Sequence, residues 1–266
     1  MNRLYGGSNA KYGESPWSVI IHYDMPYNKR GKFVSSAYWE CGGTIIHKQW
    51  VLTAASCNFW PGDKDNPSAS NYYRIRVQFM DVMRRTAIKT MTVPTKNVYR
   101  HPDYVYQSDT HSRYDIALYK LPWELDIDIW DGVTVPLVNT PVCLPNNASV
   151  YYNRELTTMF GWGVYNTYIY RYNFISLFEW EIQPDIMQKV DFVLSPHNEC
   201  PEGLLCSKPS ESMFVKPTGC DDDKGSALVQ YTDAYRSRAI LVGVYIGRTL
   251  IKGTKGCKDN TKSMLY

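Results

Sequence analysis

The sequence contains no long apolar run. A helix that crosses a bilayer needs about 20 apolar residues, and the longest run here, AILVGVYIG at 239–247, has nine. We therefore expect a buried strand there and no membrane association. The amino terminus, MNRLYGGSNAKYG, also lacks the apolar core of a secretory leader.

Blocks of like charge and metal-binding patterns are missing as well. The 29 lysine and arginine residues against 26 acidic residues give a net charge of only +3, without a basic run, so we expect no nucleic-acid partner. The cysteines form no CxxC pair, and the histidines lie apart without metal-ligand spacing. We therefore expect no metal and no cofactor. The histidines are His22, His47, His101, His111 and His197.

What the chain does contain is a series of short runs rich in Val, Ile, Tyr and Thr, separated by turn-forming residues. Examples are WSVIIHY, YYRIRVQFM, DIALYKL and QKVDFVL. This pattern predicts an all-β protein. Two packed β-barrels would suit the length, joined near VPLVNTPVCLP at 135–145.

Several motifs follow one another in a familiar order: CGGTII, WVLTAASC, DIALYKL, VCLP, FGWG and TGCDDDKGSAL. Together they resemble the trypsin/chymotrypsin-type serine proteases over the whole chain. The resemblance implies one domain at residues 4–266, made of two six-stranded antiparallel β-barrels. Barrel 1 would cover about residues 4–135 and barrel 2 about residues 136–266.

The same resemblance implies three disulfides and leaves one cysteine over. Because the seven cysteines fit disulfides better than metal, we expect a mature secreted protein whose leader is absent from this sequence. The extra cysteine, Cys143, is either a buried thiol or half of an intermolecular bridge. The implied pairs are Cys41–Cys57, Cys200–Cys206 and Cys220–Cys257.

Three groups carry acyl transfer in this family: a serine attacks, a histidine takes its proton and an aspartate orients the histidine. The aspartate matches Asp115 in RYDIALYKL, but Ser56 stands in VLTAASC where the family has the histidine. A serine hydroxyl is too weakly basic to accept a proton near neutral pH. Lys224 replaces the nucleophile. The resemblance therefore predicts that the chain is not an enzyme and keeps no catalytic residue.

The oxyanion position and the substrate pocket also depart from the family pattern. Asp222 stands where a glycine lends its N–H to the oxyanion, so a carboxylate would repel the developing negative charge. Thr218 stands where a trypsin has its aspartate, and Met264 in SMLY would replace a pocket-lining glycine. We therefore expect a blocked pocket.

One alternative is an active hydrolase with rearranged chemistry, in which Lys224 is the base and Ser56 the nucleophile. A lysine base needs desolvation without a carboxylate partner, whereas Asp115 and the DDD run favour the protonated ammonium. We expect a salt bridge between Lys224 and Asp115 instead. A second alternative is a regulatory subunit that is disulfide-linked through Cys143.

LYGG at 4–7 resembles the newly cut amino terminus of an activated protease, which implies an ion pair between Leu4 and Asp223. Residues 1–3 would have to be removed for this pair to form. The other interpretation is a buried Asp223 that is satisfied by backbone N–H groups.

The segment VYNTYIYRYNFISLFEWEIQ, at 164–183, is much longer than the loop usual there. Tyr168, Tyr170 and Tyr172 alternate with Ile169 and Arg171, which predicts an extended hairpin. The loop could fold onto the barrel and bury its own rings. Our hypothesis is that one face covers the cleft, while the other, with Arg171, contributes to a protein-binding surface.

The departures together resemble the inactivated serine protease paralogues of scabies mites, relatives of the mite group 3 allergen-like proteases. This resemblance implies a secreted pseudoprotease that binds host complement or other defence proteins. We expect a monomer. NAS at Asn147 is an acceptor pattern for glycosylation.

Overall fold

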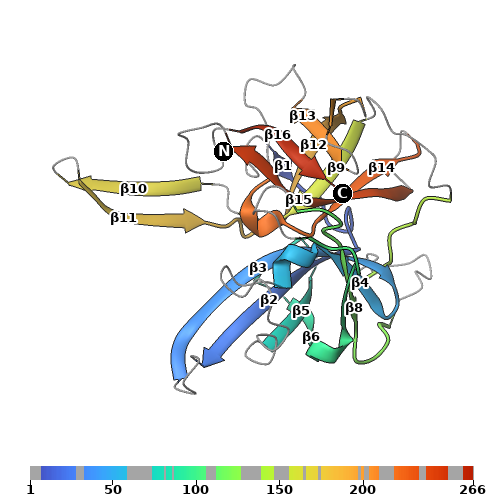
Figure 1. The fold of residues 1–266 in the computed structure, drawn as a ribbon, viewed down its shortest axis with the longest axis horizontal. Helices are drawn as coiled ribbons and strands as arrows, with labels where there is room; N and C mark the ends of the chain where they lie inside the picture. Colours follow the sequence, from blue (N-terminus) through green and yellow to red (C-terminus); the bar gives the residue numbers. More distant parts are fainter. Residues whose placement is uncertain are drawn as a thin grey trace.

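The computed structural model describes residues 7–27, 33–58, 74–80, 82–85, 87–105, 112–126, 139–146, 156–163, 166–172, 175–196, 199–200, 204–209, 219–233, 238–250 and 260–265. The prediction of an all-β protein is confirmed: the strands form two seven-stranded sheets and one separate hairpin (Figure 1). The described helices are short 3₁₀ turns. None of them is long and apolar enough to cross a membrane.

The first sheet has the strand order β6-β5-β2-β3-β4-β8-β7, and every neighbouring pair is antiparallel. In β5 the apolar residues Ile75, Val77 and Phe79 alternate with polar ones and are buried, as expected of a strand with one face on the core. The strands are β2 (Ser18–Tyr27), β3 (Phe33–His47), β4 (Trp50–Thr53), β5 (Arg74–Met80), β6 (Ala87–Val93), β7 (Val98–Arg100) and β8 (Ala117–Lys120).

The second sheet closes on itself. Its order is β1-β12-β13-β16-β15-β14-β9, and β9 also pairs with β12, so six strands form a ring to which β1 is added. This ring is the six-stranded antiparallel barrel that the resemblance implied. The strands are β1 (Ser8–Asn9), β9 (Leu156–Gly161), β12 (Gln188–Leu194), β13 (Leu205–Pro209), β14 (Ala227–Tyr231), β15 (Ala239–Leu250) and β16 (Asn260–Leu265).

The two sheets share one hydrophobic core. The largest buried cluster contains residues of both, and the ring of Trp17, next to β2, meets that of Phe160 in β9 edge to face at 6.3 Å. The two sheets therefore pack directly against each other.

The segment after β9 forms a hairpin of β10 (Asn166–Tyr172) and β11 (Ile175–Ile182). Tyr168 pairs with Trp180 and Tyr170 with Phe178, so the prediction of an extended hairpin is confirmed for the backbone. Each strand pairs only with the other among the described residues. Figure 1 shows the hairpin extending away from both sheets, so the expectation that it covers the cleft is wrong.

Candidate functional site

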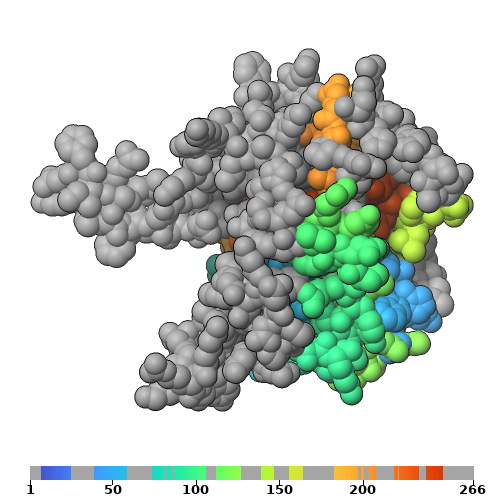
Figure 2. All heavy atoms as spheres, viewed as in Figure 1, coloured from blue at the N-terminus to red at the C-terminus, as the bar shows by residue number. Residues whose placement is uncertain are grey.

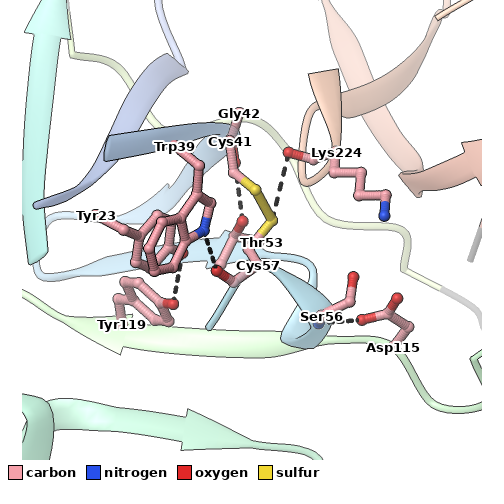
Figure 3. The surroundings of a disulfide bond; sticks show 10 residues. All are labelled: Tyr23, Trp39, Cys41, Gly42, Thr53, Ser56, Cys57, Asp115, Tyr119 and Lys224. Atoms are coloured by element: carbon pink, nitrogen blue, oxygen red, sulfur yellow. Dashed lines mark hydrogen bonds between the residues drawn. A yellow bond between two sulfur atoms is a disulfide. The ribbon is translucent and has the colours of Figure 1, made fainter. Parts of the chain in front are cut away.

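Ser56 and Asp115 meet, but through the backbone. Ser56 lies in the turn η1 (Ala55–Asn58), which follows β4, and its N–H donates to Asp115 Oδ1 at 2.7 Å (Figure 3). The Ser56 hydroxyl oxygen is buried and makes no hydrogen bond of normal geometry within the described residues. The aspartate therefore holds the main chain of η1 rather than a side-chain base.

Asp115 is 1% exposed. Burial raises the pKa of Asp115 above its ordinary value, because it disfavours the charged form; the hydrogen bond from the Ser56 N–H and the charge of Lys224 oppose this rise. Figure 3 shows the Lys224 side chain on the same side as the Ser56 hydroxyl and the Asp115 carboxylate. Ser56, Asp115 and Lys224 are called the vestigial site below.

The expected salt bridge between Lys224 and Asp115 is wrong, because the described residues contain no such ion pair. The Asp115 carboxylate is enclosed and already accepts the Ser56 N–H, whereas the Lys224 side chain is only half-buried. An ammonium that keeps part of its hydration avoids the cost of entering a closed site. The main chain of Lys224 is fixed, since its carbonyl accepts the N–H of Gly42 at 2.7 Å.

Asp223 is fully buried in the turn η5 (Asp221–Asp223). Its Oδ1 accepts the N–H of Gly163 at 2.8 Å, and its Oδ2 accepts the N–H of Cys220 at 2.9 Å. A Cβ atom on Gly161 or Gly163 would come within 2.2 or 2.3 Å of this carboxyl group, which explains both glycines of FGWG. The predicted partner, Leu4, lies outside the described residues, so that ion pair stays a prediction.

Asp222, at the predicted oxyanion position, is half-buried, and its Oδ2 accepts the side-chain amide of Gln183 at 2.8 Å. Of the predicted pocket residues, Thr218 lies outside the described residues. Met264 is placed in β16 by its backbone only, opposite Cys206 and Gly247. The structure therefore leaves the predicted role of Met264 untested.

Tyr245 is a buried residue beside the predicted pocket position that the sequence reasoning missed. Its side chain is fully buried, and a Cβ atom on Gly219 would lie 2.7 Å from the ring carbon Cζ and 3.0 Å from Met159 Cε. Gly219 precedes Cys220 at the base of the pocket implied by the resemblance. The signal was a large aromatic residue in the otherwise aliphatic stretch AILVGVYIG.

The disulfide Cys41–Cys57 forms as the resemblance implied, next to Ser56. The indole N–H of Trp39 donates to the carbonyl of Cys57 at 2.9 Å, and the Trp39 ring stacks on Tyr23 with centroids 5.0 Å apart (Figure 3). These contacts fix η1 and therefore the position of Ser56.

Among the remaining cysteines, Cys200 is joined to Cys206, again as implied. Cys220 is disulfide-bonded, and its predicted partner Cys257 lies outside the described residues. Cys143 is a free, half-buried thiol. Within the described residues, no group of three His, Cys, Asp or Glu side chains lies where it could hold a metal ion.

Comparisons with known proteins agree with this architecture. The family model for trypsin matches residues 4–257. Mouse vitamin K-dependent protein C is 26% identical over 273 residues, which cover 99% of this chain and 49% of that protein. The rat protein is 27% identical over 96% of this chain and 47% of its own length. Serine protease ea of Drosophila melanogaster is 28% identical over 61% of this chain and 40% of its own. The chain spans about half the length of the curated relatives it matches.

Proposed function

Because the chain belongs to the trypsin family of serine proteases, we propose that it is a catalytically inactive member that functions by binding another protein. The observation that carries this proposal is that Ser56 lies against the enclosed Asp115 carboxylate, at the place where the family has its histidine, and offers it a backbone N–H and no imidazole. A serine hydroxyl is too weakly basic to activate a nucleophile near neutral pH, so Ser56 cannot replace the histidine.

The losses act on separate parts of the machinery. Removing the triad of a serine protease costs roughly a millionfold in rate, which leaves only the contribution of the oxyanion hole and of substrate binding. Asp222 stands where the resemblance implies the oxyanion glycine, and its carboxylate accepts the side-chain amide of Gln183. The Tyr245 ring fills space beside Gly219, at the base of the implied pocket. The residual contributions are therefore reduced as well.

The rearranged dyad is the competing enzymatic proposal. It needs Lys224 Nζ within hydrogen-bond reach of the Ser56 hydroxyl, so that the amine can remove the proton. Among the described residues, Ser56 Oγ has no hydrogen-bond partner of normal geometry. This observation favours inactivity over the dyad.

For the partner we propose host complement or other defence proteins, as the resemblance to the inactivated mite paralogues implies, and a secreted chain. The disulfides support this, because they are typical of extracellular proteins. The proposed binding arm is the β10–β11 hairpin. Tyr168, Tyr170 and Tyr172 are alternate residues of β10, and Arg171 stands between the last two of them.

The body of the molecule offers further aromatic surface. Figure 2 shows the green segment, which includes β6 to β8, forming much of the described surface on this face. In that segment Tyr99 is 48% exposed and packs against Trp50, while Tyr114 is 40% exposed and stacks on His101. Exposed aromatic side chains are enriched at protein interfaces, so these two tyrosines also support a binding role.

The test is to pass plasma over the immobilised protein and identify what is retained by mass spectrometry. Changing Tyr168, Tyr170 and Tyr172 together to serine should weaken capture without lowering the thermal midpoint. Tyr12→Ser is the matched control, since Tyr12 is 55% exposed and lies outside both the hairpin and the surface around Tyr99. If the triple variant captures the same proteins equally well, the hairpin is not the binding arm; if plasma yields no specific partner, the binding role itself is wrong.

A further inference from the structure

One side-chain amide joins three distant segments next to the vestigial site. Gln183 is the first residue after β11, and its Nε2 donates to Asp222 Oδ2 at 2.8 Å and to Glu40 Oε2 at 3.2 Å. Asp222 lies in η5 and Glu40 in β3. The root of the hairpin is therefore hydrogen-bonded both to the turn η5 and to β3 of the first sheet.

Chemistry fixes the orientation of this amide. Ionised carboxylates only accept hydrogen bonds, so the group that faces Asp222 and Glu40 must be the NH₂ of Gln183, which has two hydrogens to give. Both hydrogens have an acceptor in the structure. A glutamate at this position could not make either bond.

The acceptor Glu40 is itself held in place. It is buried, forms an ion pair with Arg84, and its Oε1 lies 3.1 Å from His22 Nδ1. Burial opposes the charge of Glu40, but the hydrogen bonds and charges of His22 and Arg84 outweigh it and hold the pKa of Glu40 below its ordinary value. His22 in turn lies 2.5 Å from Gln78 Oε1 through its Nε2. Glu40 is therefore a fixed, charged acceptor for Gln183.

We propose that Asp222 is a positioning residue for the β10–β11 hairpin: through Gln183 it fixes the root of the hairpin against η5 and β3. An isolated pair of strands is only marginally stable and has no third strand to set its direction, so contacts at the root decide where it points. Asp222, which replaces the family's oxyanion glycine, would thus support the hairpin that we propose as the binding arm. This inference rests on the proposed function, because it takes the hairpin as that arm.

Hydrogen exchange of the hairpin amides, at 166–182, tests the positioning without any partner. Asp222→Ala removes the acceptor and should speed exchange there roughly tenfold, since about one charge-assisted hydrogen bond is lost. Asp222→Asn keeps a side-chain oxygen that can accept from Gln183, so it should exchange nearly as the wild type does. Amides of β9 and β12 serve as internal controls and should not change.

Gln183→Glu is the second variant, because it replaces the shared donor by a third carboxylate and should also speed exchange in the hairpin. If neither Asp222→Ala nor Gln183→Glu changes hairpin exchange, the positioning role is overturned. Plasma capture then separates the two proposals. Loss of capture with Asp222→Ala and its rescue by Asp222→Asn supports the link to function. Normal capture with a loosened hairpin overturns that link, although the protein would still be an inactive binder.

Discussion

Gly225, the residue after Lys224, provides a quantitative test of how tightly the loop after η5 packs against β3 and β4. Its φ is +86°, a conformation that costs an L residue about 1–2 kcal/mol. A Cβ atom there would lie 2.2 Å from the carbonyl oxygen of Gly42 and 2.2 Å from Thr53 Oγ1. Those two atoms are hydrogen-bonded to each other at 2.8 Å, so a methyl group has to separate them.

Leaving a buried polar group unsatisfied costs about 1–3 kcal/mol. With the backbone cost, Gly225→Ala should lower the free energy of unfolding by about 2–5 kcal/mol. Urea denaturation measures this as a lower midpoint at an unchanged m value. In a Thr53→Ala background one clashing atom is gone, so the same change should cost about 1 kcal/mol less. An effect of Gly225→Ala below about 0.5 kcal/mol, the range of ordinary surface changes, would refute the argument that the loop is wedged against β3 and β4.

Three further predictions concern the vestigial site, Glu40 and Cys143. The double reversion Ser56→His with Lys224→Ser should not give trypsin-like rates on fluorogenic peptides, because Asp222 and the Tyr245 ring remain; a fast double variant would show that the pocket is open. Since the pKa of Glu40 is held below its ordinary 4.5, its contribution to stability is complete above that pH and is lost as the pH falls through the lower folded value. The free energy of unfolding should therefore fall more steeply below pH 4.5 in the wild type than in Glu40→Gln, and parallel curves would contradict this. The half-buried thiol of Cys143 should react with a maleimide in the folded protein and not in Cys143→Ser, whereas an unreactive wild type that runs as a larger species on non-reducing electrophoresis would indicate an intermolecular bridge.

The sequence predicted which strands form and where the motif residues lie, because these depend on local patterns. Alternating burial in β5 and β12 follows directly from period-two patterning. Ser56 follows β4 and Asp115 precedes β8, and these two strands pair. Lys224 precedes β14, and its carbonyl accepts the N–H of Gly42 in β3. Both disulfides that the structure describes in full were implied by the family resemblance.

The side-chain contacts of the site could not be predicted in the same way. The Lys224 to Asp115 salt bridge was expected from charge alone, but the Ser56 N–H already occupies the enclosed carboxylate. Gln183 is separated in the sequence from Asp222 by 39 positions and from Glu40 by 143 positions. Its contacts with them depend on where the β11 strand ends. Strand alternation indicates that Tyr245 faces inward, but it does not indicate which space the ring fills.

Direct chemical detection of a nucleophile tests the proposed inactivity most sharply. The native protein is incubated with a fluorophosphonate, its intact mass is measured, and the same preparation is assayed on a broad peptide panel, with trypsin as the positive control. We expect no adduct and no cleavage above background, because no base is available to activate Ser56. A stoichiometric adduct on Ser56 that disappears in Lys224→Ala, together with turnover, would contradict it and establish the rearranged dyad.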